Sequence, residues 1–242
     1  MWRVTGFHSR PGVVFTPFSP GKTELSEGSL TEWANRLAIR YAVEGDIRFI
    51  SHHDSLRLFE RALARARIPV RYSSGFNPRP RMTIVMPRPV AVASMDEMLL
   101  LELTDDQDPA ELVTQLSGQM PEGITLRSAE RVPAGERRLP CEVRYSLPIA
   151  ASLQAEVARR ASEVLAEGRI EVTRRTPEST LSKRLDVRPF ILSIEVVDER
   201  VTWTQLVTPD GTVRVGEMLE ALGLMTGDHL HQVCRESLVC RG

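Results

Sequence analysis

The pattern of hydrophobic and polar residues changes near position 35. Residues 1 to about 34 contain Pro11, Pro17 and Pro20 with several glycines and serines, and no apolar period is sustained through them. Prolines and glycines interrupt regular structure, and a segment without periodic apolar residues has little to bury. We therefore expect residues 1–34 to form a flexible N-terminal extension.

From residue 37 the pattern becomes regular. Residues 37–43 alternate with a period of two, which is typical of a strand, and residues 46–50 are expected to continue that strand. Ser51 and Asp54 have the spacing of a capping box, which opens a helix. Apolar residues then recur three or four apart and predict one buried helical stripe. These residues are Leu56, Phe59, Leu63 and Ala66.

The remaining patterns describe two similar halves. The first half continues with strands at 82–85, 97–103 and 124–132 and a helix at 108–120. The second half has strands at 142–148, 170–174, 190–197, 201–207 and 232–240 and helices at 153–166 and 215–222. Apart from one additional strand in the second half, each half follows the β-α-β-β-α-β order. We predict an α+β fold with two tandem ferredoxin-like domains, residues 35–133 and 141–242, joined by a linker at 133–140.

The stretch from Arg71 to Met82 has an unusual composition. It combines Gly75, Asn77 and two prolines with the aromatic residues Tyr72 and Phe76, and it contains no acid. Such a segment cannot be a helix or a central strand, so we expect an ordered loop. Its arginines beside aromatic rings suit a surface that contacts phosphates and stacks bases, although a rigid loop with solvated charges can have the same composition. These arginines are Arg71, Arg79 and Arg81.

Positive charge is concentrated in one region, although the net charge of the chain is −1. Between Arg40 and Arg88 there are ten arginines and four acidic residues, which predicts one basic face. Arg57, Arg61 and Arg65 follow each other at intervals of four and form a ridge on the predicted helix. A polyanion or simple solvation could explain that ridge, and together with the loop it predicts an RNA-binding surface.

Two histidines stand at the expected start of this helix. His52 and His53 could act as general acid and base in an enzyme, since imidazole titrates near neutral pH. Capping and packing are the alternative roles. The helix and loop are therefore consistent either with binding alone or with catalysis at these histidines.

The cysteines are few and widely spaced. Cys141, Cys234 and Cys240 match no ordinary zinc or redox spacing, so we predict no disulfide, no metal site and no cofactor. The alternative is a metal cluster of Cys234 with His229 and His231. Three unpaired thiols favour a reducing cytoplasm. No apolar run approaches a membrane span and no signal-peptide core is visible, so we expect a cytoplasmic chain without membrane contact.

Several segments, taken in order, resemble a bacterial family called radical SAM-associated, or radical SAM-linked, proteins. The segments are 44–54, 57–63, 72–81, 87–94 and 186–191, and the resemblance extends over residues 36–241. His53 and Ala91 depart from the family pattern, which usually has an apolar residue and a glycine there. Members of this family are either fused to radical SAM proteins or occur as separate chains.

The resemblance implies a partner. The chain lacks the Cys-x3-Cys-x2-Cys spacing that holds a radical SAM iron–sulfur cluster. It is therefore expected to be a non-catalytic partner of a separately encoded radical SAM enzyme that binds RNA or presents substrate. The alternatives are a metal-independent endoribonuclease, by a fold-level similarity to CRISPR repeat-processing enzymes, and a protein–protein adaptor.

Overall fold

The computed structural model describes residues 35–133, 135–175 and 182–242. Within these residues the chain has a mixed α+β architecture with an eight-stranded main sheet, a two-stranded sheet and five α-helices. Residues 1–34, for which a flexible extension is expected, lie outside the described residues.

The first half contributes four strands and two helices. Helix α1 begins after Ser51, whose side chain accepts a hydrogen bond from the Asp54 amide, as the capping pattern predicts. Asp108 caps α2 in the same way, and Pro109 occupies the first turn. The elements are β1 (Arg36–Val43), α1 (His52–Arg65), β2 (Met82–Ile84), β3 (Ala93–Glu102), α2 (Pro109–Ser117) and β4 (Ile124–Arg131).

The second half contributes six strands and three α-helices. Strands β6 and β7 pair only with each other, while the other four strands join the main sheet. The elements are β5 (Leu139–Pro148), α3 (Ala151–Ala166), β6 (Glu171–Arg175), β7 (Ser182–Asp186), β8 (Ile191–Val197), β9 (Arg200–Leu206), α4 (Val215–Ala221), α5 (Thr226–His229) and β10 (Cys234–Arg241).

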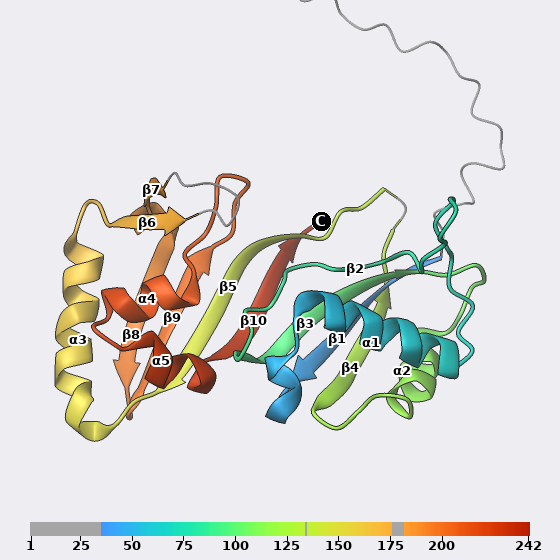
Figure 1. Cartoon of the computed structure of the whole chain (residues 1–242), viewed down its shortest axis with the longest axis horizontal. Helices are drawn as coiled ribbons and strands as arrows, with labels where there is room; N and C mark the ends of the chain where they lie inside the picture. Colours follow the sequence, from blue (N-terminus) through green and yellow to red (C-terminus); the bar gives the residue numbers. More distant parts are fainter. Residues whose placement is uncertain (1–34, 134, 176–181) are drawn as a thin grey trace, which may run out of the picture. The chain divides into compact units, whose positions relative to one another are not determined.

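The main sheet has the order β4-β1-β3-β10-β5-β9-β8, and β2 pairs with β3 beside this path. Residues 99–101 of β3 pair with β2, whereas Ala93 and Ser94 pair in parallel with Cys234 and Arg235 of β10. Strands of both halves therefore belong to one sheet, and β10 is the strand that joins them (Figure 1).

Each half has its own hydrophobic cluster. Phe59 and Leu63 of α1 pack with the alternating residues Leu37 and Ile39 of β1, while Val157 of α3 packs with Trp203 and Tyr145 in the second half. In Figure 1, α1 crosses in front of the strands of the first half, and α4 and α5 lie in front of β8 and β9. The predicted stripe of α1 is confirmed, since Phe59, Leu63 and Ala66 are buried and Leu56 packs against the same cluster.

One local prediction is wrong, and one strand was not predicted. Residues 46–50 do not continue β1, because Gly45–Phe49 forms a 3-10 helix that starts at Gly45 with φ = +59°. A positive φ turns the chain out of the sheet at a residue that glycine can occupy without strain. Strand β7 was not predicted, because its polar sequence lacks an apolar pattern and it pairs only with β6.

The predicted boundaries at 35–133 and 141–242 stay a prediction. Strand β4 ends at Arg131 and β5 begins at Leu139, so the last two residues of the expected linker at 133–140 belong to β5.

Candidate functional site

The loop from Arg71 to Arg81 is an ordered hairpin. The Arg81 amide donates to the Arg71 carbonyl at 2.7 Å, and the Ser73 amide donates to the Arg79 carbonyl at 2.8 Å. The Arg79 amide returns a hydrogen bond of 3.0 Å to the Ser73 hydroxyl. The base of the hairpin continues the sheet, since the Glu102 backbone bonds to both Arg71 and Arg81.

The tip of this hairpin presents aromatic side chains to solvent. Gly75 has φ = +144°, a conformation that favours glycine and allows the tight turn. Phe76 is fully exposed and Tyr72 is half exposed (102% and 51%). A fully exposed phenyl group on a hydrogen-bonded loop buries nothing within the described chain, so packing does not explain it.

The arginines of the predicted RNA surface differ in their partners. Arg57 lies 3.5 Å from Asp54, and Arg81 lies 3.4 Å from Glu102. Arg65 donates to the side chain and carbonyl of Gln119 (3.2 and 2.6 Å) and so holds the end of α2. Arg61 and Arg79 form no ion pair with a described residue.

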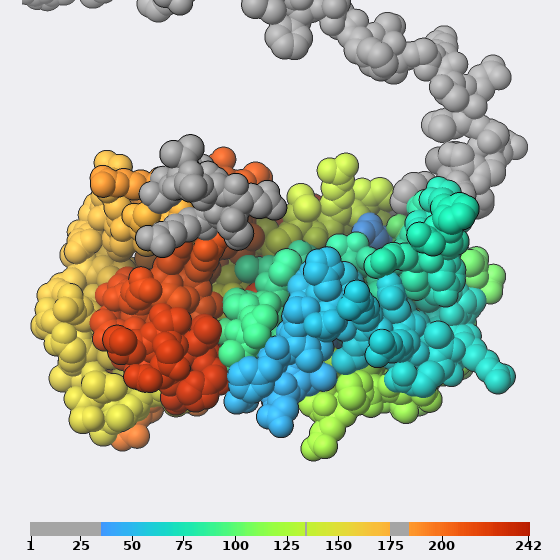
Figure 2. Space-filling model, viewed as in Figure 1, coloured from blue at the N-terminus to red at the C-terminus, as the bar shows by residue number. Residues whose placement is uncertain are grey.

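Most of the predicted RNA-binding residues are exposed. The exposed ones are Arg57, Arg61, Arg65, Tyr72, Phe76, Asn77 and Arg79, whereas Arg71 and Arg81 are half-buried. Helix α1 and the segment that follows it both face the viewer in Figure 2.

His52 and His53 occupy the first turn of α1, with ring centroids 5.9 Å apart. Burial and the neighbouring His53 lower the pKa of His52. Neither imidazole has a hydrogen bond to a described residue, and Ser55, the nearest hydroxyl on the helix, donates to the Ser51 carbonyl. Among the described residues, no hydroxyl or carboxylate group is hydrogen-bonded to either imidazole.

The described residues also contain no group of three or more His, Cys, Asp or Glu side chains that could hold a metal ion. Cys141, Cys234 and Cys240 are free thiols. No helix among the described elements is long and apolar enough to cross a membrane.

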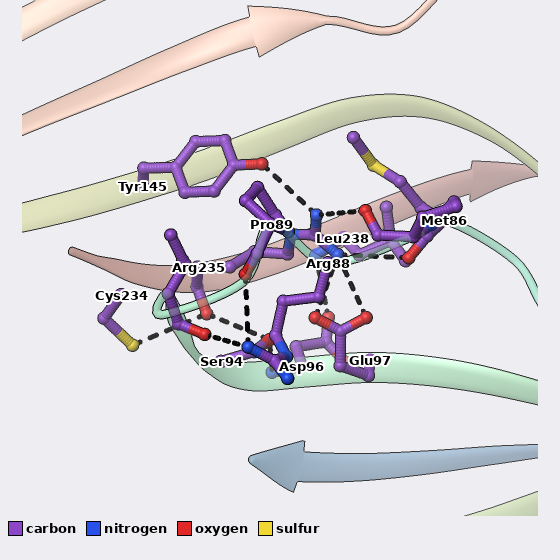
Figure 3. Close-up of polar contacts among 12 residues, drawn as sticks. Met86, Arg88, Pro89, Ser94, Asp96, Glu97, Tyr145, Cys234, Arg235 and Leu238 are labelled. Carbon is purple, nitrogen blue, oxygen red and sulfur yellow. Dashed lines mark hydrogen bonds and ion pairs between the residues drawn. The ribbon is translucent and has the colours of Figure 1, made fainter. Parts of the chain in front are cut away.

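A fully buried ion pair lies where the two halves meet. Both carboxylate oxygens of Glu97 on β3 accept hydrogen bonds from Nη1 of Arg235 on β10, at 2.9 and 3.0 Å. Figure 3 shows Arg235 between Glu97 and the Tyr145 hydroxyl, to which its Nη2 donates at 3.3 Å. The same guanidinium donates to the carbonyls of Met86 and Pro87.

Arg88 holds the segment that follows. Its Nη1 donates to the carbonyls of Arg48, Val92 and Pro89, at 2.7, 2.5 and 3.2 Å. The three acceptors come from the 3-10 helix and from both sides of a turn in which Ala91 has φ = +75°. Sequence reasoning missed Arg88, Glu97 and Arg235 as a group. The available signal was a carboxylate directly before the apolar run 98–101 of β3 and an arginine inside the last strand.

Comparison with known proteins places the chain in one family. No curated protein matches it. The sequence profile of one bacterial family matches residues 36–216, a range that contains the hairpin, α1, the Arg88 turn and Glu97. Because this match spans more than half of the chain, the chain belongs to the family described as "Uncharacterized protein conserved in bacteria (DUF2344)".

Proposed function

We propose that this chain is a non-catalytic RNA-binding protein and that the 71–81 hairpin is its main RNA contact. The observation that carries the proposal is Phe76, which is fully exposed at the tip of a hydrogen-bonded hairpin. Stacking of a base on an aromatic side chain contributes about 1–3 kcal/mol and tolerates any base. Arg79 lies on the same hairpin without an ion-pair partner among the described residues, so it is available for a phosphate.

Helix α1 would extend this contact along the RNA backbone. Arg57 and Arg61 are exposed and one helical turn apart, and α1 leads into the hairpin. Arg65 contributes less in this proposal, because its guanidinium already binds Gln119.

We interpret both halves as ferredoxin-like repeats. The order β4-β1-β3-β2 in the first half and β10-β5-β9-β8 in the second support this interpretation, since corresponding strands take corresponding places. In this interpretation the β6–β7 sheet is an insertion between the first helix and the second strand of the repeat.

We further propose that the chain acts with a separately encoded radical SAM enzyme, an assignment that rests on the sequence resemblance alone. The partner would supply the cluster ligands that the three cysteines of this chain cannot provide. Co-purification of the two chains at moderate salt supports this assignment, and stoichiometric iron–sulfur absorbance from the isolated chain contradicts it.

RNA binding is tested by fluorescence anisotropy with a labelled hairpin RNA that carries a single-stranded loop. Phe76→Ala is expected to weaken binding about tenfold, because one stacked base is lost. Phe49→Ala is the matched control, since Phe49 is an exposed phenylalanine outside the hairpin. Equal effects of the two substitutions, or no binding by the unaltered chain, would refute the assignment of the hairpin.

Phosphate contact is tested by the salt dependence of the same affinity. Replacing Arg79 and Arg81 together by alanine should reduce the slope of log affinity against log salt by roughly 1.4, about 0.7 for each contact to a single strand. Arg159→Ala on the exposed face of α3 is the control and should leave the slope unchanged. An unaltered slope in the double variant would show that these arginines do not contact phosphate.

The same RNA also tests the enzymatic alternative. We expect the purified chain to leave the RNA intact. If the chain cleaves the RNA and His52→Ala or His53→Ala abolishes the cleavage, the chain is an endoribonuclease and this proposal is wrong.

A further inference from the structure

A small cavity lies between β1, the first turn of α1 and the start of β3. Its volume is about 10 Å³, enough for one water-sized group. Apolar side chains form part of its wall. The rest of the wall consists of polar and charged side chains that can form hydrogen bonds or ion pairs with a ligand. The polar lining residues are Tyr41, His52, Ser55, Arg88 and Glu97.

The charge around this cavity is not balanced. Glu97 is already paired with Arg235 through both carboxylate oxygens. Arg88 has no ion-pair partner among the described residues, and its hydrogen bonds to carbonyls use only Nη1. Nε and Nη2 of Arg88 thus remain available to donate to a ligand. The charges of Glu97, Arg235 and Arg88 sum to one positive charge beside the cavity.

Tyr41 contributes a hydroxyl donor without an acceptor. Its side chain is 3% exposed, and its ring packs edge-on against Phe59 with centroids 5.0 Å apart. The hydroxyl makes no hydrogen bond to any residue in the described ranges, so it is free to donate into the cavity that Tyr41 lines. Burial and Glu97 raise the pKa of Tyr41, so the hydroxyl is protonated and can donate.

The first turn of α1 adds to this arrangement. The Ser51 side chain and carbonyl accept from the amides of Asp54 and Ser55, which leaves the His52 and His53 amides without a partner in the described chain. The amino end of a fourteen-residue helix favours negative charge. Asp54 opposes this effect, but its carboxylate is exposed and bonded to Ser51, with Arg57 nearby.

We propose that this cavity is an oxyanion site that receives one terminal oxygen of a phosphate or carboxylate group, with the Tyr41 hydroxyl as donor and Arg88 as charge partner. The rest of the ligand remains outside, because the volume admits only one such group. His52, Ser55 and Arg88 are half-buried, so they form the part of the lining from which a ligand can enter. This site is independent of the RNA-binding hairpin.

The test compares the thermal stability of the chain in inorganic phosphate, in acetate and in chloride at equal ionic strength. We expect phosphate, acetate or both to raise the unfolding temperature above its value in chloride, and the difference between the two identifies the preferred group. Tyr41→Phe should fold normally, since it removes only an unpaired hydroxyl. We expect it to weaken the affinity for the stabilising anion about tenfold in calorimetry.

Two further variants make the outcome specific. Arg88→Lys keeps the charge but loses the planar fork, and it should also weaken binding of the anion. Phe76→Ala should leave anion binding unchanged, so failure of the RNA proposal and failure of this one can be told apart. Stabilisation by phosphate and acetate no greater than that by chloride would show that the cavity holds only water, and full retention of binding in Tyr41→Phe would equally overturn the proposal.

Discussion

Asp96 on β3 binds the backbone of Leu238 on β10, with a carboxylate oxygen 2.9 Å from the Leu238 amide. Arg40 completes this contact, since its Nη1 donates to the Leu238 carbonyl at 2.8 Å and to both Asp96 oxygens at 2.9 Å. The ladder between β3 and β10 includes only residues 93–94 and 234–235. Beyond that short ladder, the side chains of Asp96 and Arg40 connect the two strands in place of backbone hydrogen bonds.

Removing the Asp96 carboxylate should destabilise the fold. Asp96→Ala leaves the half-buried Arg40 guanidinium and the Leu238 amide without their acceptor, at a cost of about 2–3 kcal/mol. The free energy of unfolding in urea measures this cost. Asp106→Ala is the control, because Asp106 pairs with Arg131 at an exposed position and should change stability little.

The Glu97–Arg235 pair should be costly to break but replaceable as a unit. Arg235→Met leaves a buried carboxylate unpaired, and we expect a loss of about 3–5 kcal/mol in the free energy of unfolding. The double variant Glu97→Leu, Arg235→Met removes both charges and should recover part of that loss. A double variant less stable than Arg235→Met alone would mean that the unpaired Glu97 carboxylate is not the source of the loss.

Gly123 should tolerate no side chain. It has φ = +86°, and a Cβ there would lie 2.5 Å from the Glu44 carbonyl oxygen and 2.9 Å from Ile47. We expect Gly123→Ala to cost about 2–4 kcal/mol, because strain and overlap combine. Gly118→Ala provides the comparison, since its new methyl group would meet only the Gln115 carbonyl at 3.8 Å. Equal stability of the two variants would contradict the geometry of the turn before β4.

Cys234 should react slowly with alkylating reagents. Burial and the Glu236 carboxylate raise the pKa of its thiol from 9.0 to about 11. The reactive thiolate then forms about a hundredth of its usual fraction near pH 8, and alkylation should be roughly a hundredfold slower than in the unfolded chain. Peptide mass spectrometry after timed alkylation, with and without denaturant, measures the ratio. Similar rates in both states would mean that the thiol is accessible and unperturbed.

Local patterns were sufficient for most elements of the fold. The capping role of Ser51, the start of a helix at Asp108 and the stripe through Phe59 and Leu63 were predicted from local sequence, because the ends and the buried face of a helix have characteristic residue spacings. Strand β7 and the 3-10 helix were not, because β7 has mixed charges and a single partner, and the turn at Gly45 depends on packing against Gly123.

For the candidate sites as well, features formed by neighbouring residues were predicted and features formed by distant residues were not. The hairpin was expected from Gly75, Asn77 and the prolines, all close in sequence. The cavity was not, because Tyr41, Arg88 and Glu97 come from separate segments that only the sheet brings together. Pairing of Glu97 with Arg235 spans 138 positions, and no local pattern reports such a contact.

The position of β10 has a consequence for biosynthesis. Its two neighbours, residues 93–102 and 139–148, leave the ribosome well before residues 234–241 do. Until then β5 presents an unpaired strand edge, and β3 presents one at residues 93–94. Such an edge is the kind of surface on which nascent chains aggregate or pair wrongly. The central strand of this sheet is therefore the last to be synthesised. Until β10 pairs with β3 and β5, the nascent chain needs a chaperone or other protection for these edges.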